Sequence, residues 1–386
     1  MRKHTLKILM AGFLLGALPL KAQQPCPGLP VVMNTPEDKL MLAVNGADDP
    51  QQKVEALNAF AAEHPDSTFI PCVNEYLTMA YVKLQDFPKA IEAGEKDLAA
   101  DYLDLNLLIN LLKAYVGSGN ASDKAFDLIG KAPEIIHSEI GSSIPATATE
   151  EEAQKLRQAD QAQTKDFTAY MEYAFFQLLP RVTDSAKRLA ALAAFVKGYP
   201  ETTNVGQINT QYLLAYQMAN QPDKMFEYGE KAVASDASNV STLNLVADAY
   251  ASARAHLKEA GTYAKKALEL GTNLQKPEGM TDEQFKIFRD TQLGLAHYTL
   301  GYVALLEGSE RRNVAPAIGE FEKADDLLAS NPALQGRTLY WLGWAYERIY
   351  PPRHSSAIQA LTKATELQSP YQGEAQKLLN QVKQAQ

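Results

Sequence analysis

The sequence predicts an all-α fold, an α-solenoid built from helix-turn-helix units, and three observations lead to this prediction. The chain of 386 residues is dominated over long stretches by Ala, Leu, Gln, Glu and Lys, which favour helices. Hydrophobic residues make up 46% and charged residues 22%, so there is enough apolar surface for a folded core. Residues 53–132 also align without a gap with residues 188–267. Self-similarity of such long period is typical of helical-repeat proteins.

The first 22 residues have the layout of a secretory signal peptide. Arg2 and Lys3 precede an apolar run over residues 8–20, and the small residue Ala22 comes before a polar stretch. The apolar run, about 13 residues, is shorter than the roughly 20 that a helix needs to cross a bilayer. We therefore predict cleavage after Ala22, export, and no transmembrane segment in the mature chain. Cys26 does not follow the cleavage point directly, so we expect no lipid anchor.

Charge and cysteine content narrow the possible roles further. Removal of residues 1–22 takes away four basic residues and moves the formal charge from -9 to about -13. An acidic surface repels phosphate backbones and anionic lipids, which argues against nucleic-acid binding. Cys26 and Cys72 are the only cysteines, and two thiols in an oxidising compartment can form a disulfide. Alternatively, Cys26 lies in a mobile N-terminal segment and Cys72 is simply a small buried residue.

The duplication defines the domain organisation. About 22 of the 80 aligned positions are identical, including Ala80 and Tyr81, which recur as Ala215 and Tyr216. After an N-terminal extension over 23–35, we place a first repeat block at 36–187, a second at 188–316 and C-terminal repeats at 317–369. Each block carries a polar insertion, 133–160 and 272–288, which we expect to be a long connection. Residues 370–386 are expected to form a capping helix, which solenoids need to cover their last core face.

Within each block, small and aromatic residues are spaced as in the tetratricopeptide repeat. Around Ala90, Leu77 and Tyr81 lie upstream, and Asp86 and Phe87 occupy the turn. The C-terminal segments match best, with Leu300, Gly301, Ala317, Phe321 and Ala324 in one and Leu339, Leu342, Gly343, Tyr346, Ala357, Leu361 and Ala364 in the next. These offsets resemble the tetratricopeptide repeat, a helix-turn-helix unit of 34 residues. The resemblance covers about residues 36–369 as roughly seven repeats and implies a right-handed α-solenoid.

The sequence contains no constellation for catalysis, cofactor binding or metal binding. None of the six histidines lies four residues from another histidine or from a cysteine, and the HExxH and CxxC spacings are absent. GxSxG, GxxxxGK[ST] and GxGxxG are absent as well. We therefore predict that the protein is not an enzyme and has no cofactor.

The resemblance directs attention to the first helix of each repeat, because these helices line the concave surface of such solenoids. Peptide-binding members of the family hold a C-terminal carboxylate with Lys and Asn. The corresponding positions here carry Glu75, Met79, Thr210 and Gln217. The sequence therefore does not support a carboxylate clamp of that kind.

Four aromatic residues form the candidate partner-binding site. Tyr298, Tyr302, Tyr340 and Trp344 fall at spacings of four on two successive first helices. Tyr and Trp are favoured anchors in protein interfaces, so these side chains are candidates for gripping an extended peptide or a helix. The alternative is that they pack between adjacent helices.

The sequence favours a non-catalytic, exported scaffold that binds a protein or peptide partner in its concave groove. Because "ALNAFAAEHPDSTF" and its neighbours resemble bacterial envelope repeat proteins, we expect the bacterial periplasm as its location. The alternative is a receptor that stacks a small ligand or glycan on the aromatic residues. A receptor predicts a deep pocket walled by the two insertions, whereas a scaffold predicts an open channel.

Overall fold

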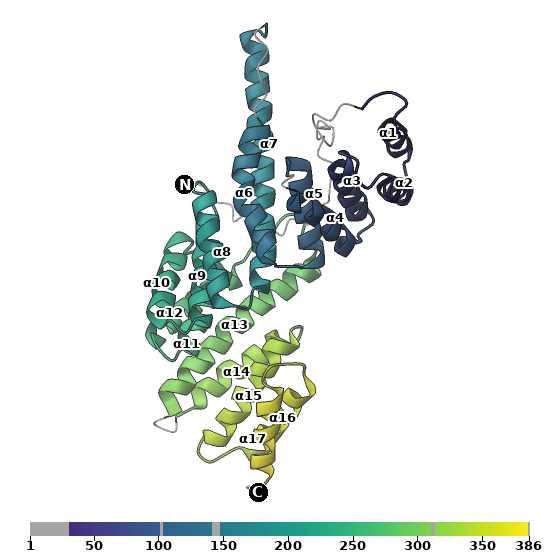
Figure 1. Ribbon diagram of the computed structural model, residues 1–386. Helices are drawn as coiled ribbons and strands as arrows, with labels where there is room; N and C mark the ends of the chain where they lie inside the picture. Colours follow the sequence, from purple (N-terminus) through teal and green to yellow (C-terminus); the bar gives the residue numbers. More distant parts are fainter. Residues whose placement is uncertain (1–30, 101–102, 141–146, 310–312, 385–386) are drawn as a thin grey trace. The chain divides into compact units, whose positions relative to one another are not determined.

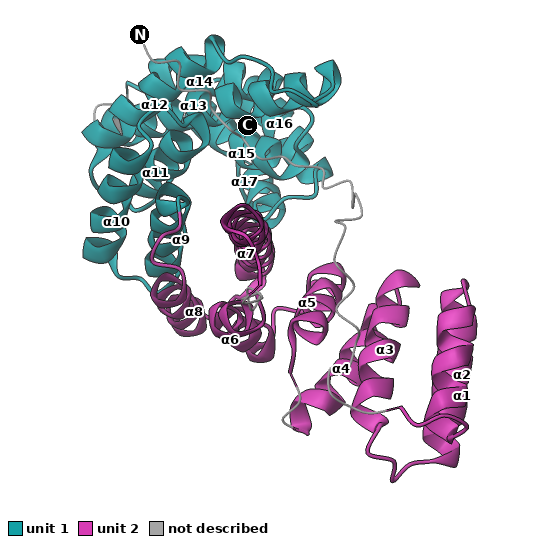
Figure 2. Cartoon of the chain, turned by 90° about the horizontal axis from the view of Figure 1, so that it is seen from above, with its two compact units in different colours: residues 1–10, 203–386 teal, residues 11–202 magenta. Residues whose placement is uncertain are grey.

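The computed structural model describes residues 31–100, 103–140, 147–309 and 313–384, and within them every regular element is a helix (Figure 1). The chain divides into two compact units, coloured separately in Figure 2. Among the described residues, unit 2 contains those up to residue 202, and unit 1 contains those from residue 203 onward. The predicted signal peptide and Cys26 lie outside the described residues. The prediction of an all-α helical-repeat fold is confirmed.

Unit 2 contains eight α-helices and one short 3-10 helix among its described residues. They are α1 (Pro36–Gly46), α2 (Pro50–Glu63), α3 (Ile70–Lys83), α4 (Phe87–Ala99), α5 (Leu105–Ser118), α6 (Asp123–Glu139), α7 (Glu150–Leu178), η1 (Leu179–Arg181) and α8 (Ser185–Gly198).

Unit 1 contains nine α-helices among its described residues. They are α9 (Val205–Met218), α10 (Pro222–Ser235), α11 (Val240–Ser252), α12 (Leu257–Thr272), α13 (Asp282–Ser309), α14 (Ala315–Leu327), α15 (Pro332–Arg348), α16 (His354–Glu366) and α17 (Gln372–Gln384).

In unit 1, consecutive helices pack as pairs, and each first helix also contacts the first helix of the next pair. In unit 1 the pairs are α9 with α10, α11 with α12, α13 with α14 and α15 with α16, while α11 contacts α13 and α13 contacts α15. α17 then packs on α15 and α16 and buries Ala375, Leu379 and Val382 against the core of unit 1. This is the packing expected of tetratricopeptide-type repeats, so the resemblance drawn from the sequence is confirmed.

The helix boundaries repeat with the period of the sequence duplication. α2 and α8 are both 14 residues long, and each begins after an aspartate, Asp49 or Asp184, whose side chain accepts a hydrogen bond from a backbone N–H of the first turn. The turns recur too, because Gln85 and Asn220, one period apart, both have positive φ angles, 59° and 52°. The duplication is thus preserved in caps and turns as well as in side chains.

Gly94 and Gly229 stand where an aromatic residue is usual in this kind of repeat, and the structure gives the reason. A Cβ atom at Gly229 would lie 2.5 Å from the hydroxyl oxygen of Tyr250, a side chain on the next first helix. At Gly94 it would lie 3.0 Å from Leu111 on α5, one helical turn before Tyr115, the counterpart of Tyr250. The next first helix therefore supplies the bulky side chain, and glycine makes room for it.

The two segments predicted to be long polar connections are partly helical, which corrects that expectation, although residues 273–281 do form a connection. Residues 133–139 continue α6, residues 150–160 begin α7, and residues 282–288 begin α13. Thr149 and Glu152 form a capping box, and Thr281 and Gln284 exchange the equivalent hydrogen bonds at 3.0 and 3.2 Å. Each insertion therefore includes an N-terminal extension of a first helix. In Figure 1 the N-terminal half of α7 extends beyond α6.

The compact units and the predicted repeat blocks divide the chain at different places. The boundary between the units falls after Thr202, between α8 and α9, whereas the second block was placed from residue 188 onward. α8 packs on α6, which explains why it stays with unit 2 although it starts the second copy in the sequence. The block boundaries remain predictions about the ancestry of the sequence.

Candidate functional site

Two of the four predicted site residues are buried in the core of unit 1. Tyr298 and Tyr302 on α13 are only 2% and 5% exposed. Their rings stack on each other with centroids 6.0 Å apart, and Tyr298 also lies 5.8 Å from Phe321 of α14. α13 is buried in this way because α12, α14 and α15 all pack on it. For Tyr298 and Tyr302, packing between helices is the correct interpretation, and exposure in a groove is not.

The other two predicted residues, Tyr340 and Trp344 on α15, are partly exposed and belong to a larger aromatic cluster. Trp341 lies between them in the chain, with its ring centroid 5.0 Å from that of Tyr340 and 6.1 Å from that of Trp344. Tyr371, just before α17, lies 5.3 Å from Tyr340. We call Tyr340, Trp341, Trp344 and Tyr371 the aromatic cluster. All four side chains are partly solvent-accessible.

An ion pair lies next to the aromatic cluster in the sequence of α15. Arg337 precedes Trp341 by one helical turn and donates hydrogen bonds from Nη1 to both carboxylate oxygens of Asp248 on α11, at 2.9 and 3.2 Å. Its guanidinium carbon lies 3.8 Å from the ring centroid of Tyr298, a cation–π contact. Burial lowers the pKa of Arg337, but the charge of Asp248, the nearby Tyr298 and the hydrogen bonds to Asp248 together outweigh burial and raise the pKa. The pair thus connects α15 directly to α11, and α13 packs on both of these helices.

The sequence reasoning missed Trp341 and Tyr371. Trp341 follows Tyr340 directly, so it does not fit the spacing of four that selected the other residues. Its position four residues after Arg337 could have indicated it, because this spacing places the two side chains on one face of a helix. Tyr371 lies outside any helix, and its contact with Tyr340 depends on the tertiary structure.

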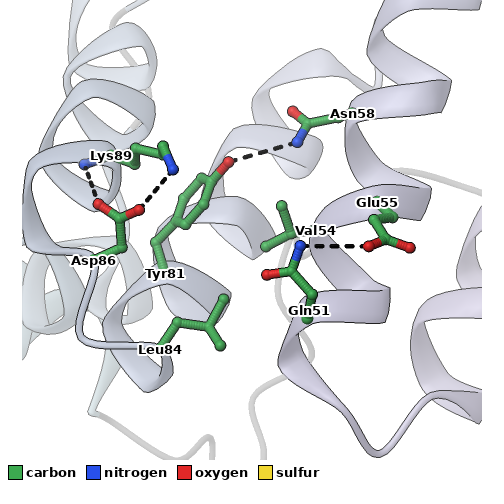
Figure 3. A pocket seen from close by; sticks show the side chains of 8 residues that line it. All are labelled: Gln51, Val54, Glu55, Asn58, Tyr81, Leu84, Asp86 and Lys89. Carbon is green, nitrogen blue, oxygen red and sulfur yellow. Dashed lines mark hydrogen bonds and ion pairs between the residues drawn. The ribbon is translucent and has the colours of Figure 1, made fainter.

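Unit 2 contains a second candidate, an open cleft of about 690 Å³ that we call the α2–α4 cleft (Figure 3). One wall is α2, and the opposite wall is formed by the end of α3 and the start of α4. The cleft is lined on the α2 side by Gln51, Val54, Glu55 and Asn58 and on the other side by Tyr81, Leu84, Asp86 and Lys89.

Hydrogen bonds connect most of the polar side chains of this cleft. Asn58 Nδ2 donates to the hydroxyl of Tyr81 at 3.5 Å, and Gln51 Nε2 donates to Glu55 at 3.4 Å. Lys89 pairs with Asp86 at 2.7 Å and lies 5.5 Å from the ring centroid of Tyr81. The sequence reasoning did not select this cleft, because isolated polar residues on a second helix resemble an ordinary solvated face.

The positions considered for a carboxylate clamp do not form a ligand site. Glu75 is fully buried, and Thr210 is almost fully buried and donates its hydroxyl to the backbone oxygen of Gly206 at 2.8 Å. Cys72 is buried within unit 2, while Cys26 lies outside the described residues. The predicted disulfide therefore stays a prediction.

Two histidines of unit 1, His297 and His354, contact glutamate side chains. His297 Nδ1 lies 2.6 Å from Glu320, and His354 Nδ1 lies 2.9 Å from Glu347. Within the described part of the chain, no group of three His, Cys, Asp or Glu side chains is arranged to hold a metal ion. No helix there combines the length and hydrophobicity that crossing a membrane requires.

The sites described above belong to an all-helical repeat protein, and comparison with solved structures finds proteins with helical repeats. One is the C-terminal part of a TPR repeat-containing protein from Cytophaga hutchinsonii, with 15% sequence identity, a TM-score of 0.45, and coverage of 78% of this chain and 97% of that chain. Another is the APC/C hetero-tetramer Cut9-Hcn1, with 13% identity, a TM-score of 0.26, and coverage of 91% and 90%. Similarity at this level supports no inference about function. No family model and no curated protein matches the sequence.

Proposed function

We propose that the protein is a non-catalytic, exported scaffold that binds another protein through the aromatic cluster of unit 1. The observation that carries this proposal is the presence of four partly exposed aromatic side chains, Tyr340, Trp341, Trp344 and Tyr371, at one place. Aromatic side chains bury a large area at a small entropic cost and are enriched among residues that dominate binding energy.

The rim of the cluster supports a protein partner as well. Arg348, one turn after Trp344, is exposed and places its guanidinium carbon 4.5 Å from the Trp344 ring centroid. Arginine joins tyrosine and tryptophan as a residue enriched in interfaces. A cluster with an apolar centre and a charged rim therefore fits a peptide or a helix that offers an apolar anchor next to an acceptor.

Export to the bacterial periplasm belongs to the proposal and is supported by the sequence of residues 1–22. The absence of an enzymatic role is supported by the lack of catalytic motifs in the sequence. The alternative, a receptor for a small ligand or glycan, predicts a pocket walled by residues 133–160 and 272–288. The α2–α4 cleft and a smaller cleft between α4 and α6 are lined by residues outside both segments, so neither supports it.

The test is affinity capture from an envelope extract with immobilised protein, residues 23–386, at low and high salt. We expect one or two proteins to be retained at high salt, and we expect the Tyr340→Ala/Trp344→Ala variant to lose at least about 30-fold in affinity, as hot-spot residues do. Tyr350→Ala is the matched control, because Tyr350 follows α15 and is 79% exposed outside the cluster. Undiminished capture by a double variant with a wild-type circular dichroism spectrum would remove the site from the proposal.

A further inference from the structure

We propose that the α2–α4 cleft of unit 2 binds an ammonium or guanidinium group carried by a basic peptide segment. This goes beyond the proposed function, since it concerns another unit, another surface and another chemistry.

Each side-chain nitrogen group of the cleft already makes one contact. The ammonium of Lys89, the only cation in its lining, pairs with Asp86 at 2.7 Å. Asn58 donates its amide N–H to Tyr81, and Gln51 donates its amide N–H to Glu55. Figure 3 shows these three contacts around the ring of Tyr81.

Three side-chain oxygens on the α2 wall remain without a donor from the described part of the protein. Among the described residues, no donor contacts the side-chain carbonyl oxygens of Gln51 and Asn58, or the second carboxylate oxygen of Glu55. Because Asp86 is neutralised by Lys89, Glu55 leaves the cleft with a formal charge of about -1. In Figure 3 the ring of Tyr81 lies between the Lys89–Asp86 pair and the side chains on α2.

A cationic group with several N–H donors matches this arrangement. An ammonium has three donors and a guanidinium five, and neither accepts hydrogen bonds. Either would meet the Glu55 carboxylate and the two amide oxygens, whereas the Tyr81 ring already has the Lys89 ammonium 5.5 Å from its centroid. The volume of about 690 Å³ exceeds that of one side chain, so a flanking peptide segment fits as well. A free polyamine shares the cationic chemistry but not the peptide backbone.

The duplicated copy shows that the fold does not require these acceptors. In the 135-residue register, Tyr81 and Lys89 recur as Tyr216 and Lys224, whereas Glu55 and Asn58 are replaced by Ala190 and Ala193. α2 and α8, which carry the differing residues, still have the same length and the same kind of N-cap. Tyr81 and Lys89 therefore belong to the shared framework, and the acceptors are a property of the first copy alone.

The test uses fluorescence anisotropy with a labelled peptide, acetyl-Ala-Arg-Ala-Lys-Ala-amide, and the full chain. A neutral counterpart carries citrulline and acetyl-lysine, and spermidine serves as the polyamine probe. We expect the neutral peptide to bind at least about tenfold more weakly. Glu55→Gln is expected to weaken binding of the basic peptide about fivefold, the upper end for an exposed ion pair.

Glu63→Gln is the matched control, since it removes the same charge from an exposed position of α2 outside the cleft. It is expected to change the affinity less than twofold. Equal losses in Glu55→Gln and Glu63→Gln would overturn the proposal, because they would indicate attraction to the acidic protein as a whole. Equal affinity for the neutral peptide would also overturn it. Binding of spermidine without binding of the basic peptide would overturn the assignment to a peptide. None of these outcomes depends on the aromatic cluster.

Discussion

Asp97 on α4 is the residue whose burial is hardest to reconcile with a charge. Its side chain is fully buried, accepts one hydrogen bond from Asn74 Nδ2 at 2.9 Å, and leaves its second oxygen without a partner. Burial raises the pKa of Asp97 to about 7, an effect that the Asn74 hydrogen bond opposes and the charge of Asp104 reinforces. Folded unit 2 therefore holds a proton that the unfolded chain releases near pH 4.

Asp97→Asn is expected to change how stability depends on pH. The folded-state pKa lies above the unfolded value of 3.8. The contribution of Asp97 to the free energy of unfolding is therefore fully present below about pH 4, and it is lost as the pH rises to about 7. Asparagine stays neutral, so the variant gains stability over the wild type across this window, by at most roughly 4 kcal/mol. Thermal melts by circular dichroism at pH 4 and pH 8 measure the gain.

Asp127→Asn, at an exposed position of α6, controls for the loss of one negative charge. Slower amide hydrogen exchange in α3 to α5 of the Asp97→Asn variant would assign the gain in stability to unit 2. An Asp97→Asn variant with the same pH dependence as the wild type would show that Asp97 is ionised in the folded protein near neutral pH.

Gly229→Ala is expected to destabilise unit 1 by about 1–3 kcal/mol through overpacking. The new Cβ would lie 2.5 Å from the Tyr250 hydroxyl, which is held by Glu230 at 3.0 Å and by the backbone oxygen of Phe226 at 3.1 Å. Gly261→Ala is the control, since its nearest neighbour would be 4.0 Å away. That change is expected to stabilise by about 0.5–1 kcal/mol. Urea unfolding followed by tryptophan fluorescence measures both, because the only two tryptophans lie on α15.

The candidate sites were only partly predictable at this scale. Tyr340 and Trp344 were found by helical spacing, but the same spacing selected Tyr298 and Tyr302, which are buried. Periodicity gives the face of a helix and not how many neighbours cover that face. The cleft acceptors carry no motif at all. Comparison of the two copies would have revealed Glu55 and Asn58, because alanine replaces both in the second copy.

At the scale of elements, first helices are tied together by polar contacts as well as by apolar packing. The ion pair of Arg337 and Asp248 joins α15 to α11, and both side chains are largely buried, with 16% and 26% exposed. Within the described residues, Nε and Nη2 of Arg337 have no acceptor, so Asp248 provides its only charge-compensating contact. Removal of the carboxylate would leave a buried, uncompensated cation.

Asp248→Ala is therefore expected to destabilise unit 1 by about 2–3 kcal/mol. Glu227→Ala is the comparison, because Glu227 pairs with Lys224 and Lys231 at an exposed position of α10, both at 2.7 Å. Exposed pairs contribute little because solvent screens them, so we expect a much smaller destabilisation there. Tryptophan fluorescence in urea follows both variants. Equal effects of the two substitutions would contradict the structural role given to the Asp248–Arg337 pair.

At the scale of the whole molecule, the sequence predicted the repeat architecture well, because a duplication preserves several independent signals at once. Caps at Asp49 and Asp184, turns at Gln85 and Asn220 and the glycines Gly94 and Gly229 all recur in one register. The division into compact units was not predictable in the same way. It depends on which helices pack, and α8 packs on α6 although its sequence opens the second copy.

The central claim is that the chain contacts another protein through the aromatic cluster of unit 1. The most direct measurement is photo-crosslinking in cells, with p-benzoylphenylalanine placed at Trp344 and, for comparison, at exposed Tyr350. The account predicts a discrete higher-mass adduct containing a second protein from position 344, and none from position 350. The same adducts from both positions, or none from position 344 in a folded and exported variant, would contradict it.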